Sequence, residues 1–210
     1  MNRKVQAFND TADRWVVKPV ARSYVRVVPK VVRRGVSNFF ENLTYPIVIV
    51  NQFLQGKVVQ GFSDLGRFAI NSTLGVGGLL DPASDAHLAL HNEDFGQTFG
   101  KWGVTAGPYL VLPILGPSTF RDGAGSLCSA PLIPWRYSED EFIRYGATAL
   151  YGLDTRAGLL NAEQLISGDR YTFLRDAYLQ RRQYLIKDGQ VEDEFMDESS
   201  SDDDASAKGP

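Results

Sequence analysis

The segment from Lys57 to Leu74 carries its polar residues on one narrow stripe, and this feature constrains the fold most. Five polar side chains recur at spacings of three and four residues, the period of one helix face: Lys57, Gln60, Asp64, Arg67 and Asn71. Apolar side chains cover most of the remaining circumference. A surface helix of an ordinary globular protein has a wider polar face. The segment therefore needs an apolar environment on most of its sides.

The preceding segment, Ile47–Gln55, repeats the pattern, with Asn51, Gln52 and Gln55 as its only polar residues. Buried apolar surface contributes about 25 cal/mol per Å². If seven of the apolar side chains of Lys57–Leu74 stayed in water, the protein would therefore lose on the order of 10 kcal/mol of stabilisation. Two environments could cover them. One is the core of a soluble helical bundle. The other is a membrane interface, with three tryptophans near the headgroups: Trp15, Trp102 and Trp135.

Helix-starting and helix-breaking residues predict a mainly α fold. Ser138, followed three residues later by Glu141, forms a capping box that opens a helix toward Leu153. The other expected helices are Pro19–Val28, Val31–Phe40, Ile47–Gln55, Lys57–Leu74 and Tyr171–Lys187. Glycines and prolines between Thr105 and Pro117 predict an irregular hairpin. The 19 uncharged residues of Trp102–Phe120 approach membrane-spanning length, but the same glycines and prolines argue against a spanning helix.

Charge divides the chain into one helical domain, 1–190, and an acidic disordered tail, 191–210. The last 23 residues hold nine acids and one lysine, and such a segment has too little apolar surface to fold. The first 36 residues hold nine basic and two acidic residues, which suits anionic lipid headgroups or nucleic acid. They lack the interleaved aromatics and basic density of a nucleic-acid reader, so no nucleic-acid partner is predicted.

The sequence predicts no catalytic residue, no cofactor and no metal site. Cys128 is the only cysteine and can form no internal disulfide, redox pair or zinc cluster. His87 and His91 are four residues apart, but the residues around them favour turns over a helix. Three acid–base neighbours are either buried ion pairs inside a polar channel or surface salt bridges: Asp64 with Arg67, Arg121 with Asp122, and Asp154 with Arg156.

Several collinear segments resemble the MlaA (VacJ) family. The strongest lies between Asn92 and Gly125 and contains EDFGQTFGKWGVTAGPYLVLPILGPSTFRDGAG. Four others occur in the family's order: SNFFENLTYPIVIVNQFLQGK, GRFAINSTLGVGGLLDPAS, DTRAGLLN and RDAYLQRRQYL. The resemblance covers roughly Phe8 to Gly189. So long a collinear match is more specific than any single short motif.

This resemblance implies both a fold and a function. Family members are outer-membrane lipoproteins that remove misplaced phospholipids from the outer leaflet and so maintain lipid asymmetry. The expected architecture is a ring-like arrangement of amphipathic helices in the inner, periplasmic leaflet around an amphipathic channel, with a hairpin near its mouth. The expected partners are phospholipids, a trimeric porin and the periplasmic lipid carrier MlaC. The family has no known cofactor or hydrolytic activity, so the chain is not expected to be an enzyme.

Site residues follow from combining the stripe with the resemblance. Lys57, Gln60, Asp64, Arg67 and Asn71 are expected to line the channel or to contact headgroups. The hairpin is expected to control access to the channel through Gly107, Pro108, Tyr109, Leu110, Pro113, Gly116 and Pro117. A second interpretation gives the stripe only polar contacts between helices. The competing functions are a soluble helical lipid-binding or scaffold protein and, less favoured, a phospholipase.

The N-terminus departs from the family pattern. Family members carry a signal peptide and a lipobox cysteine before the mature domain. Met1–Lys18 lacks the apolar stretch of about 7 to 15 residues that a secretory signal needs, and Cys128 is internal. We therefore expect that the N-terminus has been trimmed or replaced by Met1.

Overall fold

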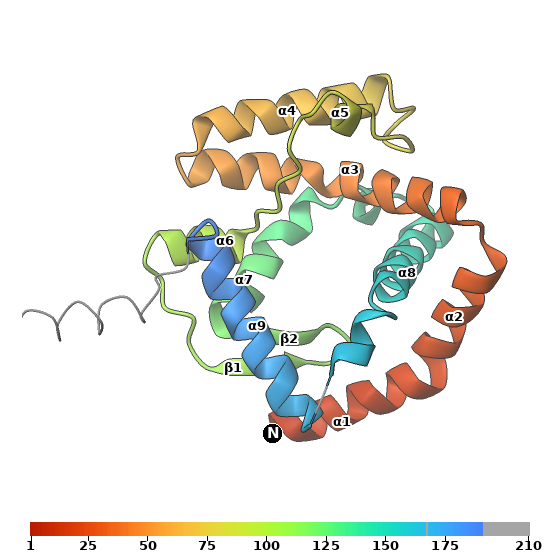
Figure 1. The fold of residues 1–210 in the computed structure, drawn as a ribbon, viewed down its shortest axis with the longest axis vertical. Helices are drawn as coiled ribbons and strands as arrows, with labels where there is room; N and C mark the ends of the chain where they lie inside the picture. Colours follow the sequence, from red (N-terminus) through yellow and green to blue (C-terminus); the bar gives the residue numbers. More distant parts are fainter. Residues whose placement is uncertain (167, 191–210) are drawn as a thin grey trace, which may run out of the picture.

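The first long helices follow three consecutive sides of a frame in the computed structural model, which describes residues 1–166 and 168–190 (Figure 1). Helix α1 (Asn2–Ala12) continues through a π-helical turn (Asp13–Val17) into α2 (Lys18–Val27). Val28 is extended, as residues before a proline tend to be, and α3 (Lys30–Leu54) begins after Pro29. The predicted acidic tail, 191–210, lies outside the described residues.

The remaining elements close the frame and enter it (Figure 1). Helix α4 (Val58–Thr73) runs alongside α3, and the short α5 (Pro82–Asp85) packs on α4. The fourth side combines α6 (Phe95–Lys101), strands β1 (Tyr109–Leu112) and β2 (Gly116–Thr119), α7 (Phe120–Ser129) and α9 (Arg170–Ile186). Helix α8 (Glu141–Gly158) contacts both α2 and α3. Short 3-10 turns at Ala130–Leu132, Pro134–Tyr137 and Ala162–Leu165 join α7, α8 and α9.

Several sequence predictions are confirmed. The polar-stripe segment is α4, the basic N-terminal segment is α2, and the last predicted helix is α9. The predicted hairpin is the antiparallel pair β1–β2, in which Tyr109 lies opposite Thr119 and Leu112 lies opposite Gly116. Within the described residues, no helix is both long enough and apolar enough to cross a membrane.

The prediction of two helices over Val31–Phe40 and Ile47–Gln55 was wrong, because α3 is a single helix of 25 residues with Pro46 inside it. A proline removes one backbone hydrogen bond and crowds the preceding turn. Helix α3 packs against both α4 and α8, and such tertiary contacts supply most of the stability of helices in proteins. One lost bond therefore does not end the helix.

The start of α8 differs from the prediction, and four other helices were not expected. The N-cap of α8 is Asp140, whose carboxylate accepts the backbone N–H groups of Phe142 and Ile143; the predicted capping box at Ser138 does not form. Asp140 is the better N-cap because its carboxylate accepts two backbone N–H groups and because its negative charge is stabilised by the positive end of the helix dipole. Helices α1, α5, α6 and α7 were not predicted.

The distribution of polarity is inverted relative to an ordinary globular domain. The largest side chains with less than 2% exposure are all polar: Gln52, Gln97, Asn51, Thr98, Thr119 and Asp64. Large apolar side chains on α4 face outward, with Val59 83% and Phe62 62% exposed. Soluble proteins bury aliphatic and aromatic residues and seldom leave such surfaces uncovered. The inversion favours the membrane-interface interpretation over the soluble bundle.

Candidate functional site

Two neighbouring hollows lie along α3 and α8. The first, of about 420 Å³, is enclosed by the middle of α3, the segment 90–92 and one face of α8. The second, of about 450 Å³, lies between α2, the start of α3 and the end of α8. Both are lined by Ser37 and Asp154, so the two hollows meet at this pair.

The first hollow combines aromatic side chains with a carboxylate. Phe40, Tyr45 and Tyr151 line it. Phe40 contacts Trp135 edge to face at a ring-centroid distance of 5.4 Å, and Tyr151 contacts the same indole in a tilted arrangement at 5.5 Å. Glu41 also lines it. Burial raises the pKa of the Glu41 carboxyl, and this carboxylate in turn adds to the burial-driven rise in the pKa of Tyr151. A charged acid and an electron-rich aromatic wall therefore face the same space.

The second hollow is basic. Lys30, Arg33 and Arg34, all from the first turns of α3, line it. The Arg33 Nε–H group donates to the carbonyl oxygen of Val28 at 3.2 Å, which fixes the base of that side chain. The opposite wall comes from Ala157, Gly158, Leu160 and Asn161 at the end of α8. Charges of opposite sign thus line adjoining hollows.

The junction between the hollows is held by hydroxyl groups. Ser37 Oγ donates to Asp154 Oδ2 at 2.7 Å, and Tyr24 Oη donates to Asp154 Oδ1 at 3.0 Å. Burial and the Asp154 carboxylate raise the pKa of Tyr24 to about 12. These bonds connect α2, α3 and α8 where the two hollows meet.

Asp64 of the predicted stripe does not line the first hollow, but it hydrogen-bonds to residues that do. It is fully buried, and its Oδ1 atom lies 2.8 Å from both Tyr45 Oη and His91 Nδ1. Gln52 Nε2 donates to its Oδ2 atom at 3.0 Å. Tyr45 and His91 themselves line the hollow. Asp64 therefore positions two wall residues.

Two further stripe residues fasten the segment after α4. Arg67, 2% exposed, donates to Asp81 Oδ2 at 2.6 Å, to Ser84 Oγ at 2.9 Å and to the carbonyl of Leu88 at 2.8 Å. Asn71 Nδ2 donates to Asp81 Oδ1 at 2.8 Å. Because these bonds join α4 to α5 and to the segment beyond it, they favour the interpretation in which the stripe makes contacts between helices.

The two ends of the stripe differ from its middle. Lys57 Nζ pairs with Glu93 Oε1 at 2.8 Å and also with Asp188, so it links α4 to the end of α9. Gln60 is exposed. The five stripe residues thus do not share one surface, and their contact with headgroups stays a prediction.

The predicted gating hairpin is attached to α1. Asn2 Nδ2 donates to the carbonyl of Tyr109 at 2.7 Å, and Asn9 Nδ2 donates to the carbonyl of Leu112 at 2.9 Å. The tip of the hairpin exposes apolar side chains, with Ile114 81% and Leu115 78% exposed. Its role as a gate stays a prediction, and no sequence pattern indicated the α1 attachment.

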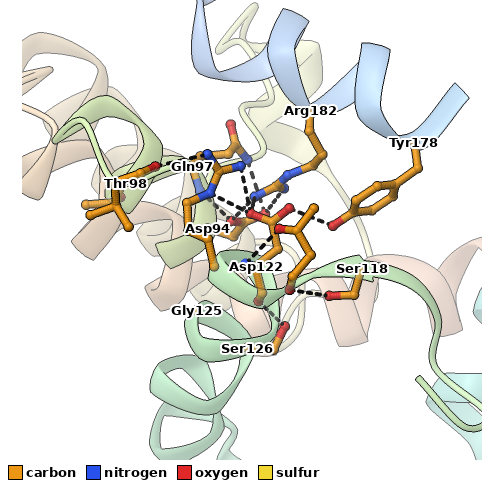
Figure 2. Close-up of polar contacts among 12 residues, drawn as sticks. Asp94, Gln97, Thr98, Ser118, Asp122, Gly125, Ser126, Tyr178 and Arg182 are labelled. Atoms are coloured by element: carbon orange, nitrogen blue, oxygen red, sulfur yellow. Dashed lines mark hydrogen bonds and ion pairs between the residues drawn. The ribbon is translucent and has the colours of Figure 1, made fainter. Parts of the chain in front are cut away.

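A partly buried ionic network joins α6, α7 and α9 beside the hairpin (Figure 2). Arg182 of α9 donates to Asp94 Oδ2 at 2.6 Å and to Asp122 Oδ1 at 3.0 Å, and Tyr178 Oη donates to Asp122 Oδ2 at 2.8 Å. Burial alone would raise the pKa of both carboxyls, but the hydrogen bonds and the Arg182 charge hold both pKa values below their usual range. This network is a structural joint outside the hollows.

Of the three acid–base pairs considered in the sequence, all within the described residues, only one forms an ion pair in the structure. Arg121 and Asp122 form a buried pair at 3.0 Å. The carboxylate of Asp64 bonds to Tyr45, Gln52 and His91 instead of Arg67, so that pairing does not form. Arg156 pairs with Asp13 at 2.6 Å and with Glu163, instead of with Asp154.

The residues considered for metal binding lie apart in the part of the chain that the structure describes. Cys128 is exposed. Residues 88–94, which include His91, are not helical, and His91 is engaged with Asp64. Across residues 1–166 and 168–190, no group of three or more histidine, cysteine or acidic side chains is arranged to hold a metal ion.

Comparison with known proteins gives a consistent set of relatives. The sequence model of the MlaA lipoprotein family matches residues 1–185. The chain is 38% identical over 198 residues to the intermembrane phospholipid transport system lipoprotein MlaA of Shigella flexneri and of Escherichia coli (strain K12). In each case the match covers 90% of this chain and 78% of the relative. The protein of the same name from Haemophilus influenzae is 34% identical over 199 residues, with the same coverage.

A solved structure also matches. It is described as the structural basis for maintenance of bacterial outer membrane lipid asymmetry. The TM-score is 0.77 at 37% sequence identity, and the match covers 88% of this chain and 96% of the other.

Proposed function

This chain belongs to the MlaA lipoprotein family, and we propose that it removes mislocalised phospholipids from the outer leaflet of a bacterial outer membrane. In this proposal it lies in the periplasmic leaflet, works beside a trimeric porin and passes lipid to the periplasmic carrier MlaC. It thereby maintains lipid asymmetry. The names of its relatives, which describe intermembrane phospholipid transport, support the lipid and the membrane.

The observation that carries the proposal is the inverted polarity around the two hollows. Apolar side chains such as Val59 and Phe62 face outward, where acyl chains would cover them. Charged and hydroxyl side chains line the hollows. A phospholipid headgroup is costly to move through hydrocarbon because its charges lose their hydration. A polar path along α3 and α8 would lower that cost while the acyl chains stay in the bilayer.

No chemical step is required. The lipid enters and leaves unchanged, so the protein needs no nucleophile, metal or cofactor, and its work is to offer successive polar contacts to a headgroup. The stripe residue Asp64 contributes by positioning Tyr45 and His91 in the wall. The hairpin between Gly107 and Pro117, held by α1, controls access in this proposal.

The test is a translocation assay in vesicles that contain a fluorescent phospholipid in both leaflets. A membrane-impermeant reductant bleaches only the outer leaflet unless the protein brings inner-leaflet lipid within reach. We expect the wild-type protein to extend bleaching beyond the outer leaflet. Ser37→Trp should abolish this extension, because the indole would fill the junction between the hollows.

Ser126→Trp is the matched control, since Ser126 is an exposed serine on α7 that lines neither hollow. It should behave like the wild type. Normal translocation by Ser37→Trp would remove the α3–α8 path from the proposal. A wild-type protein that stays in the aqueous phase as a monodisperse monomer would instead support the soluble lipid-binding or scaffold alternative.

A further inference from the structure

Glu41 has no cationic partner although it faces a hollow. No hydrogen bond or ion pair to its carboxylate comes from any residue in 1–166 or 168–190. The nearest basic groups are already engaged: the Arg67 guanidinium bonds to Asp81, Ser84 and the Leu88 carbonyl, and His91 Nδ1 bonds to Asp64. Partial burial raises the pKa of the Glu41 carboxyl, and the Arg67 charge offsets only part of that rise; the residue as a whole stays exposed to the hollow. A cation that entered the hollow would stabilise the charged carboxylate.

The walls beside Glu41 suit an organic cation in particular. Phe40, Tyr45 and Tyr151 line the same hollow. The face of an aromatic ring attracts an ammonium group, and the attraction grows where water is excluded. A carboxylate with aromatic side chains around it therefore favours an alkylammonium over a strongly hydrated metal ion.

The adjoining hollow suits the opposite charge. Lys30, Arg33 and Arg34 present three cations to it, and guanidinium groups match phosphate oxygens in geometry as well as charge. The two hollows meet at Ser37 and Asp154. A ligand that carries a phosphate and an ammonium group on one short linker could therefore contact both hollows at once.

We propose that the paired hollows select zwitterionic phospholipids whose headgroup carries a primary ammonium, with the amine on Glu41 and the phosphate on Arg33 and Arg34. This inference rests on the proposed function and adds a headgroup preference to it. A purely anionic headgroup could bind the basic hollow through its phosphate. It has no ammonium group, so it would leave the Glu41 carboxylate without a cationic partner. Such a penalty on the competing ligand is a common source of specificity.

The experiment measures which lipid the detergent-solubilised protein retains. The protein is equilibrated with mixed micelles containing equal amounts of phosphatidylethanolamine and phosphatidylglycerol, and the bound lipids are extracted and quantified. We expect the wild type to enrich phosphatidylethanolamine about fivefold, as one partly buried ion pair would give. Glu41→Gln keeps the shape of the side chain and should bring the ratio close to one. Glu139→Gln, at an exposed glutamate outside both hollows, should keep the wild-type ratio.

A second pair of variants separates phosphate binding from amine binding. Arg34→Gln should lower the total bound phospholipid several-fold while the ratio of the two lipids stays at the wild-type value. Arg181→Gln, at an exposed arginine of α9, should change neither quantity. In a parallel arm, water-soluble phosphoethanolamine should bind at least tenfold more weakly than the lipid, because it lacks acyl chains.

The outcomes are distinguishable. An unchanged ratio in Glu41→Gln, or equal retention of both lipids by the wild type, overturns the headgroup preference and leaves phospholipid transport standing. Failure of the wild type to retain any phospholipid overturns the proposed function together with the preference. Equal affinity for phosphoethanolamine and for the lipid would assign the site to a soluble metabolite and would overturn the inference.

Discussion

Gly125 of α7 lies directly against the backbone of Gly96 of α6, so that a Cβ atom on Gly125 would come within 2.4 Å of the Gly96 amide nitrogen. Gly96 is equally confined on its other side. A Cβ atom there would lie 2.5 Å from Arg182 Nη2 and 2.6 Å from Asp122 Oδ1. The absence of both side chains lets α6 and α7 approach closely enough for the network of Figure 2 to form.

The first prediction concerns this close approach. Gly125→Ala should lower the free energy of unfolding by about 1–3 kcal/mol, because backbone atoms cannot yield as a flexible side chain can. Gly146→Ala is the control, since among the described residues no atom lies within 4 Å of a Cβ placed at that position in α8. It should raise stability by about 0.5–1 kcal/mol, through helix propensity. Thermal unfolding followed by circular dichroism measures both, and equal effects would contradict the packing argument.

The second prediction concerns pH. Asp94 and Asp122 have pKa values below their usual range in the folded protein, so their stabilising contribution is complete above the unfolded-state pKa of about 3.9. It is lost as the pH falls through the folded-state values. The free energy of unfolding should therefore decline below about pH 4.

The comparison that isolates this effect is Arg182→Met. The Asp94 side chain is 38% exposed, so solvent screens part of this network, and removing the arginine should cost about 1–3 kcal/mol at pH 7. This loss of stability relative to the wild type should narrow toward pH 2, where the carboxyls are protonated. Arg181→Met, on the exposed side of the same helix, should follow the wild type throughout. If the free energy of unfolding of Arg182→Met stayed below that of the wild type by the same amount from pH 7 to pH 2, the interaction between the carboxylates and the arginine would not stabilise the fold.

Much of the fold could be predicted because its signals are local. The stripe on α4 depends only on spacing, and the β1–β2 hairpin depends on nearby glycines and prolines. The continuity of α3 could not be predicted, because Pro46 is a local helix breaker and the packing that overrides it comes from α4 and α8. Helix α1 has a weak apolar pattern and owes its position to contacts with β1.

The site was less accessible to sequence reasoning. The stripe was correctly recognised as unusual, but the partners of Asp64 are three residues outside α4. The hollows form where Ser37 meets Asp154, 117 residues later in the chain, and no short motif marks such a pair. Glu41 lies in a mixed polar and apolar stretch of α3, and only its surroundings in the folded chain show that its carboxylate has no hydrogen-bonding partner among the described residues.

The third prediction separates the two interpretations of the stripe. Asp64→Leu should cost about 3–5 kcal/mol, because Tyr45, Gln52 and His91 would lose their common buried acceptor. Gln60→Leu, at an exposed stripe position, should change stability by no more than about 0.5 kcal/mol. Chemical denaturation in detergent measures both. Wild-type stability of Asp64→Leu together with lost lipid transport would instead favour direct contact between Asp64 and a headgroup.

The fourth prediction concerns the attachment of the hairpin to α1. Asn9 uses both ends of its amide: Nδ2 donates to the carbonyl of Leu112 at 2.9 Å, and Oδ1 accepts the backbone N–H of Ile114 at 2.8 Å. Ile114 has a φ of 66°, which is costly for a β-branched residue, and the Asn9 bond holds it there. Thr11 is a nearby exposed residue whose hydroxyl bonds only within α1, to the carbonyl of Ala7.

Asn9→Ala should therefore release the hairpin tip while leaving the paired strands in place. Loss of both hydrogen bonds, each worth about 1 kcal/mol, should speed amide hydrogen exchange at Ile114 roughly thirtyfold, whereas Thr11→Ala should leave that rate unchanged. If the hairpin controls access to the hollows, the same variant should also change the rate of lipid translocation in vesicles. Faster exchange at Ile114 with an unaltered translocation rate would show that the tip moves without gating, and the proposed role of the hairpin would then have to be abandoned.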